Sequence, residues 1–387
     1  MRRRGYAAVS LLCALSMAAS GCAAEEKTTT AGEIPIGVNI ELSGPAAQLG
    51  ESYKNGLEAV IDEVNKKGVL NGKKIKLIYR DNKTDPTEAI RVAKNFWDNQ
   101  DVAAMIGPGV SPTSVPVTLE ANKRKVPMIS MASSTDVVRP ASERKYSYKT
   151  TPNNDDMAEV QVEALVDQKI ERVAYIAANN AYGKVSQKAF EAAAEKAGIE
   201  IVANELYNEK DKDYTPHITK MLAADPDAIA AAAINPQSTI VAKNIKAADF
   251  KGPVIFDAGA GAELFLKGAG KASEGMYMVN MPIMAANHVQ ATTPPVLRQK
   301  EFFKTYSSKF GQFSSFAPYA ADALYLYVDA IEKAKSADPE KINDALGTIQ
   351  RDGLCGRFEF SSENHGGMER GSLILLTARG GAWVPAS

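Results

Sequence analysis

Short apolar runs alternate with segments of helical period along the first part of the chain. The run IPIGVNIEL starts at Ile34 and stops at Ser43-Gly44-Pro45, as a strand stops at residues that favour turns. From Tyr53 to Val64 the apolar residues recur with a helical period, which predicts a helix that ends at Gly68. The runs KIKLIYRD, VAAMIG and VPMIS repeat the pattern. Such alternation predicts a parallel sheet with helices on both faces.

A second series of strands and helices starts near residue 150. Its expected strands are RVAYIAAN, IEIVANELY, DAIAAAAI and PVIFDAG, and its expected helices span 182–197, 217–222 and 237–248. After residue 282 the pattern is mostly helical, over 295–310, 316–334 and 339–347, before short strand-like pieces end the chain. The fold class that we predict is therefore α/β, with two doubly wound Rossmann-like lobes.

The late helices have no strands of their own, so they need an existing sheet to cover. We expect the chain to return to the first lobe and then to finish on the second. Lobe 1 would contain residues 34–151 plus 282–353, and lobe 2 would contain residues 152–281 plus 354–387. Three crossings between lobes suit a hinge that closes around a ligand.

The N-terminus has the features of a secretion signal. A basic MRRRG precedes the apolar run YAAVSLLCALSMA, which is shorter than the roughly 20 residues that a membrane span needs. The small residues of ASGC then lead to Cys22 and resemble the lipobox of bacterial lipoproteins, in which the cysteine is lipidated. We expect residues 1–21 to be a signal peptide, Cys22 to carry the lipid, and residues 22–33 to form a tether on the outer face of the cell membrane. An ordinary signal peptide is the alternative.

Composition and charge exclude some classes of partner. Of the 387 residues, 45% are hydrophobic and 24% are charged, which is ordinary for a globular protein. The formal net charge is -1 and no long basic block occurs, so we expect no nucleic-acid partner. Once Cys13 is removed and Cys22 is lipidated, Cys355 has no cysteine partner, and we expect it to be a buried, unreactive thiol.

Two apolar strands are each followed by a turn rich in Ser and Thr. These are MIGPGVSPTSVP, residues 105–116, and PMISMASSTD, residues 127–136. A phosphate-binding loop would need G-x-x-x-x-G-K-S/T, which is absent, and GAGAE at 259–263 lacks the third glycine of a dinucleotide turn. We therefore expect no cofactor.

A serine nucleophile is the second interpretation of these turns. No G-x-S-x-G motif surrounds Ser111 or Ser134, and none of the three histidines lies in a recognisable signature, although a triad can assemble from distant positions. The histidines also lack the paired spacing of metal ligands, so we expect no metal site and assign all three to polar surfaces: His217, His288 and His365.

A cradle for a carboxylate is the third interpretation. In doubly wound domains, ligands bind beyond the carboxyl ends of strands, where free backbone N–H groups and the helix dipole attract an anion. The hydroxyls that can add to these donors belong to Ser111, Thr113, Ser133, Ser134 and Thr135. Helix capping is the alternative role for them, and two neighbouring turns of this composition favour a site.

From Ile34 to about Ala345 the chain resembles the leucine/isoleucine/valine-binding family, the type I solute-binding proteins of bacterial ABC importers. The stretches that carry the resemblance are ELSGPAAQLGESYKNGLEAVIDEVNKKG, IGPGVSPTSVPVT, VPMISMASST, NNAYGKVSQKAFEAAAEKAG, EGMYMVNMP and YAADALYLYVDAIEKA. The resemblance implies the type I periplasmic-binding-protein fold, with two Rossmann-like lobes, three hinge strands and a ligand between the lobes.

The resemblance also assigns roles to single residues. The family's carboxylate-binding turns match Ser111, Pro112 and Thr113, and then Ser133 and Ser134. A tyrosine before glycine in the second lobe, which contacts the ligand in the family, matches Tyr182 in NAYGK. The wall of the first lobe would include Leu49, together with Ala47 and Gln48.

Two positions depart from the family pattern. Gly259 stands where amino-acid binders have an acidic residue for the ammonium group, with Asp257 and Glu263 close by in sequence. Ile234 or Asn235 stands where the family has a second tyrosine. A buried ammonium without a counter-charge would cost several kcal/mol. Either Asp257 takes over, or the ligand is a carboxylate with an apolar or aromatic tail, or a small amide.

These observations leave three functional hypotheses. The favoured one is a monomeric, lipid-anchored substrate-binding subunit that closes on a small molecule and docks on an ABC permease, without enzymatic activity. The second is a sensor of small amides or aromatic carboxylates with the same fold. The third is a secreted hydrolase that uses Ser111 or Ser134.

Overall fold

The computed structural model describes residues 32–261, 263–290 and 292–386. The expected signal peptide, the lipidated Cys22 and the first part of the tether therefore lie outside the described residues. Within the described ranges, no helix combines the length and the apolar character that crossing a membrane requires.

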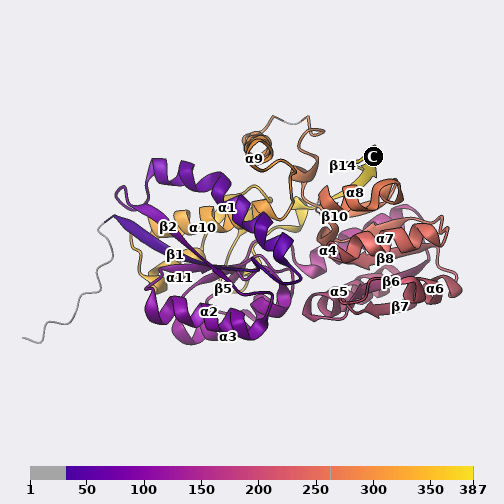
Figure 1. Cartoon of the computed structure of the whole chain (residues 1–387), viewed down its shortest axis with the longest axis horizontal. Helices are drawn as coiled ribbons and strands as arrows, with labels where there is room; N and C mark the ends of the chain where they lie inside the picture. Colours follow the sequence, from indigo (N-terminus) through magenta and orange to yellow (C-terminus); the bar gives the residue numbers. More distant parts are fainter. Residues whose placement is uncertain (1–31, 262, 291, 387) are drawn as a thin grey trace, which may run out of the picture. The chain divides into compact units, whose positions relative to one another are not determined.

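The first sheet has five parallel strands in the order β2-β1-β3-β4-β5. Its strands are β1 (Glu33–Ile40), β2 (Lys74–Asp81), β3 (Ala104–Ile106), β4 (Met128–Ser130) and β5 (Ser147–Lys149). The connecting helices are α1 (Ala47–Lys67), α2 (Pro86–Asn99) and α3 (Ser111–Arg124). Figure 1 shows α1 on one face of this sheet and α2 and α3 on the other. Because both faces are covered, the central strands β3 and β4 are fully buried.

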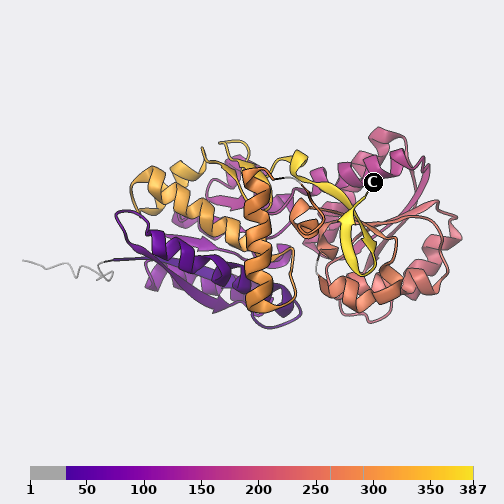
Figure 2. The same cartoon turned by 90° about the horizontal axis from the view of Figure 1, so that it is seen from above.

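Three later helices return to the first sheet: α9 (Pro294–Phe310), α10 (Ala317–Ala334) and α11 (Pro339–Leu346). The helix α10 lies against α1, and α9 crosses beside them (Figure 2). Gly56 permits the approach of α1 to α10, because a Cβ at this position would lie 2.1 Å from the carbonyl oxygen of Ala317. A two-stranded hairpin of β11 (Gln350–Asp352) and β12 (Arg357–Glu359) follows these helices.

The second sheet has seven strands in the order β14-β13-β10-β9-β8-β6-β7. Five are parallel: β6 (Arg172–Ala178), β7 (Glu200–Tyr207), β8 (Ala228–Ala232), β9 (Val254–Phe256) and β10 (Tyr277–Asn280). The last two strands, β13 (Ile374–Arg379) and β14 (Ala382–Pro385), join antiparallel at one edge. The accompanying helices are α4 (Asn154–Asp167), α5 (Ala181–Ala197), α6 (Thr215–Ala223), α7 (Gln237–Ala247) and α8 (Glu263–Ala269).

The two sheets share one topology. The order β2-β1-β3-β4-β5 in the first corresponds to β7-β6-β8-β9-β10 in the second. The chain passes between the sheets after β5, after β10 and again between β12 and β13. The α/β class with two doubly wound lobes and a hinge of three crossings is therefore confirmed. In such sheets, ligands bind beyond the carboxyl ends of the strands, where the strand order reverses.

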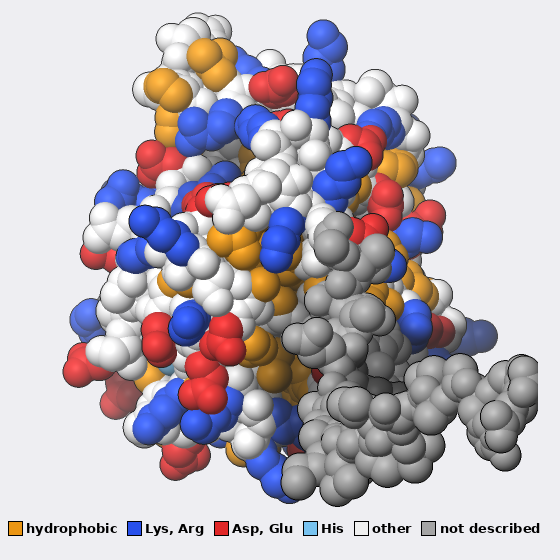
Figure 3. All heavy atoms as spheres, turned by 90° about the vertical axis from the view of Figure 1, so that its left-hand side faces the viewer, with side chains coloured by type: hydrophobic (Ala, Val, Ile, Leu, Met, Phe, Trp, Pro, Cys, Tyr) orange, Lys and Arg blue, Asp and Glu red, His pale blue; other side chains and the backbone are white. Residues whose placement is uncertain are grey.

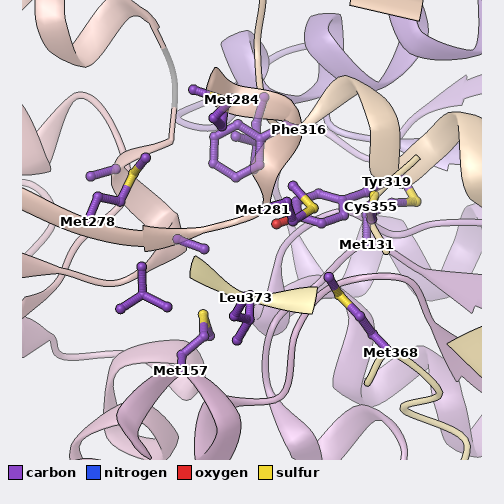
Figure 4. Packing of buried hydrophobic residues seen from close by; sticks show 14 of the residues in the cluster. Met131, Met157, Met278, Met281, Met284, Phe316, Tyr319, Cys355, Met368 and Leu373 are labelled. Atoms are coloured by element: carbon purple, nitrogen blue, oxygen red, sulfur yellow. The ribbon is translucent and has the colours of Figure 1, made fainter. Parts of the chain in front are cut away.

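Buried methionines pack where the chain crosses between the sheets (Figure 4). They come from segments far apart in sequence, and Met284 and Met281 lie beside Phe316 and Tyr319 in this view: Met131, Met157, Met278, Met281, Met284 and Met368. Methionine is unbranched and flexible, so it fills irregular space and repacks easily. This core can therefore adapt when the crossings bend.

The face shown in Figure 3 carries basic and acidic side chains that are interspersed rather than gathered by sign. This distribution agrees with the formal net charge of -1. A face of mixed sign produces no extended field that would attract a polyanion.

The strand-to-helix alternation is interrupted after β4. The turn after β4 enters a 3-10 helix of three residues, Thr135–Val137, instead of an α-helix. Arg139 still donates its backbone N–H to the carbonyl of Thr135. The next residue is Pro140, which has no N–H to continue the ladder, so the helix stops.

Replacing Gly56 with alanine is expected to lower the free energy of unfolding by about 1–3 kcal/mol, the usual cost of overpacking. The added Cβ would force α1 and α10 apart, although alanine favours a helix. Urea unfolding of wild type and variant measures the difference. Gly371→Ala is the control, because a Cβ there meets nothing within 4 Å. Equal stability of wild type and Gly56→Ala would contradict the backbone contact between these helices.

Candidate functional site

The buried side chain of Glu41 holds the turn after β3 in place. Glu41 accepts hydrogen bonds from the hydroxyl of Thr113 (2.8 Å), from the backbone N–H of Gly109 (3.2 Å) and from Nδ2 of Asn82 (3.0 Å). Burial raises the pKa of Glu41, and the bonds from Thr113 and Asn82 oppose this rise. The Thr113 hydroxyl, which sequence assigned to the ligand, is thus bonded inside the first lobe.

The turns after β3 and β4 are in direct contact. The backbone N–H of Ser134 donates to the hydroxyl oxygen of Ser111 over 3.2 Å. The hydroxyl oxygen of Ser134 accepts from the backbone N–H of Asp136 and caps the 3-10 helix. Both serines are buried, whereas Pro112 and Ser133 are partly exposed. The structure therefore brings together the two turns that the sequence singled out.

The hydroxyls of Ser111 and Ser134 keep their protons available. In the hydrogen bonds above, each oxygen acts as an acceptor for a backbone N–H. A hydroxyl group has one proton to donate beyond what it accepts. Both serines can therefore cap or orient backbone and still donate to an anion.

A buried lysine that the sequence analysis did not select lies under the second turn. Nζ of Lys149 donates to the carbonyl oxygens of Ser133 (2.6 Å) and Pro152 (3.0 Å). Its side chain is 0% exposed, and burial lowers its pKa to about 7. The one available signal was the position of Lys149 just before residue 152, where the second lobe was expected to begin.

In the second lobe, Tyr182 and Asp257 form a buried pair. The Tyr182 hydroxyl donates to Oδ2 of Asp257 over 2.5 Å, and the backbone N–H of Gly259 donates to Oδ1 over 3.0 Å. Burial raises the pKa of Asp257 to about 7, while the bond from Tyr182 opposes the rise. Asp257 follows β9 directly, so the pair lies at the carboxyl edge of the second sheet.

Gly259 makes room for this pair. A Cβ at this position would lie 2.6 Å from the Tyr182 hydroxyl and 2.8 Å from the carbonyl oxygen of Ala233. Any side chain there would displace Tyr182. The absence of an acid at Gly259 and the presence of a buried acid at Asp257 are thus parts of one arrangement.

Loops from the two lobes meet at Asn235. Its Nδ2 donates to Oε1 of Gln48 over 3.2 Å, and its Oδ1 accepts from the hydroxyl of Thr239. Leu49, the next residue after Gln48, is buried at the start of α1. The residues Leu49 and Asn235, chosen from sequence, therefore flank the same contact between lobes.

Two further hydroxyls near these groups were missed. The hydroxyl of Tyr319 and that of Ser315 are buried and have no hydrogen-bond partner within the described part of the chain. The backbone N–H of Ser315 donates to the carbonyl of Gly261, just beyond Gly259. Burial raises the pKa of Tyr319 most, and the nearby groups of Cys355, Tyr53 and Asp257, in that order, raise it further. Tyr319 begins the family-like stretch YAADALYLYVDAIEKA, and Ser315 lies just before it, but neither was selected as a site residue.

The histidines do not form a catalytic arrangement with the serines. His365 is buried and stacks on Tyr148 at 4.4 Å, so its expected surface position was wrong. Its Nδ1 faces the carbonyl oxygens of Arg144 and Ser147. Within residues 32–261, 263–290 and 292–386, no hydrogen bond joins a histidine to Ser111 or Ser134, and no cluster of three metal-ligating side chains occurs.

His217, which is half-buried, pairs with Glu205, and His288 is exposed, so neither lies at the turns. Cys355 is buried as expected, and burial raises the pKa of its thiol, which keeps the thiol protonated.

Comparison with known proteins gives consistent results. The family described as periplasmic binding protein matches residues 33–381. The Leu/Ile/Val-binding protein homolog 7 of Brucella abortus is 25% identical over 96% of this chain and 95% of its own length. An extracellular ligand-binding receptor from Rhodopseudomonas palustris HaA2 is 28% identical, with a TM-score of 0.85 over 92% of this chain and all of that one.

A solute-binding protein of R. palustris in complex with benzoate has the same fold at 18% identity, with a TM-score of 0.81 over 92% of this chain and 96% of that one. The members of this family bind solutes and are not enzymes. By the match over residues 33–381 and by its two doubly wound lobes, this chain belongs to the periplasmic binding protein family with the type I fold, the family of the Leu/Ile/Val-binding proteins that it resembles.

Proposed function

We propose that this protein is the extracytoplasmic substrate-binding component of an ABC importer. Its ligand is a small hydrophobic carboxylate, such as a branched-chain amino acid or a related acid, held between the two lobes. The observation that carries the proposal is the contact between the Ser111 and Ser134 turns at the carboxyl ends of β3 and β4. It joins the donors of two strand ends into one cradle.

The cradle has donors suited to a carboxylate. Helix α3 begins at Ser111, so its first N–H groups and the positive end of its dipole face the turn. In the described residues, no hydrogen bond uses the backbone N–H of Ser111 or Ser133. With the hydroxyl protons of Ser111 and Ser134, these groups give an anion several donors at one place.

The second lobe supplies the opposite wall. Tyr182 and Asp257 lie at the carboxyl edge of the second sheet, and Asn235 follows β8. A pKa of about 7 means that Asp257 is close to half protonated at neutral pH. It can become ionised beside an ammonium group or neutral beside an anion, so this residue decides the ligand class.

The cellular role follows from the family and the N-terminus. We infer that Cys22 carries a lipid anchor on the outer face of the cell membrane and that the ligand-bound protein docks on an ABC permease as a monomer. The supporting observations are the lipobox-like ASGC and the family match. These two observations are independent of the geometry of the site.

A thermal-shift screen tests the proposed ligand class. The probes are leucine, 4-methyl-2-oxopentanoate, benzoate and benzamide, added to the mature chain with Cys22→Ser. A ligand at about 100 times its dissociation constant stabilises the folded state by about 2.7 kcal/mol, so its melting temperature should rise clearly. We expect the carboxylates to raise the melting temperature and benzamide to leave it unchanged. Stabilisation by benzamide alone would contradict the carboxylate cradle.

Ser134→Ala is expected to weaken binding of the most effective carboxylate by about 1–3 kcal/mol, the range for hydrogen bonds to charged groups. Isothermal titration measures the affinity, and calorimetric melting measures the stability. Ser114→Ala is the matched control, because the buried Ser114 hydroxyl on α3 donates to the Pro108 carbonyl (2.9 Å) inside the first lobe. That variant should lose stability and keep its affinity. Loss of stability without loss of affinity in Ser134→Ala would reduce Ser134 to a helix cap.

Asp257→Asn separates amino acids from acids that lack an amine. Both carboxylate oxygens of Asp257 already accept protein hydrogen bonds, so we expect 4-methyl-2-oxopentanoate to bind more tightly than leucine. Ionised Asp257 repels this anion, so affinity should fall as pH rises through about 7 and fall less steeply in Asp257→Asn. The opposite result is an affinity for leucine that rises with pH and drops about tenfold or more in the variant. That result would make Asp257 the ammonium site.

A further inference from the structure

Lys149 is a cation in an unusual place. It is the last residue of β5, its side chain is fully buried, and the first crossing to the second lobe starts at the next residue. Burying an ammonium group costs several kcal/mol unless it is well bonded. The hydrogen bonds of Lys149 must therefore offset the cost of burying its ammonium group.

The ammonium of Lys149 fixes the orientation of the Ser133–Ser134 peptide. Its Nζ holds the carbonyl oxygen of Ser133 at 2.6 Å. This peptide bond is trans, so its C=O and N–H point in opposite directions. Holding the carbonyl therefore aims the N–H of Ser134 toward the hydroxyl of Ser111, where the 3.2 Å hydrogen bond is found.

The same ammonium also holds the crossing. Its second acceptor is the carbonyl oxygen of Pro152, at 3.0 Å. The crossing runs beside the second turn through further hydrogen bonds: Thr150 N–H to the Ser130 carbonyl, the Thr151 hydroxyl to the Ala132 carbonyl, and Thr135 N–H to Oδ1 of Asn154. A shift of the turn is thus transmitted to the crossing.

Few charges surround this ammonium. Besides burial, Arg139 beyond the 3-10 helix lowers the pKa of Lys149, while Asp155 and Asp156 on α4 raise it. Arg139 is itself paired with Asp155. The backbone N–H of Lys149 donates to the carbonyl of His365, whose ring faces Tyr148 instead. An anion at the cradle would add a negative charge near Lys149 and favour its charged form.

We propose that Lys149 is a positioning residue that aims the Ser133–Ser134 turn at an anionic ligand and links ligand binding to the first crossing between the lobes. The inference rests on the proposed function, because it needs a carboxylate at that turn. Lys149 acts through the Ser133 carbonyl and the crossing and does not itself touch the ligand.

The test compares Lys149→Met, which keeps the apolar stem, with Lys149→Arg, which keeps the charge. Both are made in the Asp257→Asn background, so that Asp257 does not add its own pH dependence. Thr151→Val is the matched control, because it removes a neutral hydrogen bond from the same crossing to the same loop. Titration calorimetry between about pH 6 and pH 8.5, on either side of the Lys149 pKa of about 7, measures the binding of 4-methyl-2-oxopentanoate and of its neutral amide.

Lys149 is charged below its pKa, so affinity for the anion should be highest near pH 6 and fall as pH rises. We expect Lys149→Met to bind the anion about tenfold or more weakly near pH 6 and to lose this pH dependence. Lys149→Arg should keep binding without the pH dependence, because arginine stays charged. Thr151→Val should keep the pH dependence of the parent.

Unchanged affinity and pH profile in Lys149→Met would overturn the role of Lys149 and leave the proposed function intact. Failure of the parent protein to bind any carboxylate would instead overturn the proposed function. If Lys149→Met does not fold, NMR titration of the Lys149 ammonium in the parent decides the question. Its pKa should rise when 4-methyl-2-oxopentanoate is added, and no rise would overturn the inference.

Discussion

One hydrogen bond joins the parts on which the site depends, namely the bond from the backbone N–H of Ser134 to the hydroxyl of Ser111. It links the ends of two neighbouring parallel strands, β3 and β4, which by themselves only place two loops near each other. Buried ionisable groups support it from both sides. Glu41 holds the first turn through Gly109 and Thr113, and Lys149 holds the carbonyl that precedes Ser134.

Three buried ionisable groups lie at strand ends. Glu41 follows β1, Lys149 ends β5 and Asp257 follows β9, and burial shifts the pKa of each toward the neutral form. Desolvation makes each group costly in isolation. Hydrogen bonds to backbone groups offset this desolvation cost. The same hydrogen bonds fix the orientation of the bonded peptides at the edges where the lobes meet.

The second lobe contains a steric relationship that bears on the proposed ligand class. The family's acidic residue cannot be restored at Gly259 without moving Tyr182, because a Cβ there would lie 2.6 Å from the tyrosine hydroxyl. The acid has instead a buried position at Asp257, bonded to that tyrosine. Under the proposed function, a ligand would meet this buried pair, in which burial raises the pKa of Asp257 to about 7.

The sequence by itself determined the class of fold, the strand-to-helix alternation, the family and the two serine-bearing turns. These features are encoded locally, by apolar period and by turn residues, and the ends of most helices agreed to within a few residues. Thr113 shows the limit, because its place in the turn was evident but its bond to Glu41, far away in sequence, was not.

Only the tertiary structure decided what lies beneath and beside the turns. Lys149 and Ser315 carry no local motif, and Tyr319 lies in a family-like stretch that does not mark it as a site residue; the crossings of the chain bring all three here. Gly259 and Asp257 can be interpreted only from the position of Tyr182. Local periodicity specifies which residues form an element, whereas burial and hydrogen bonding depend on partners brought together by the whole fold.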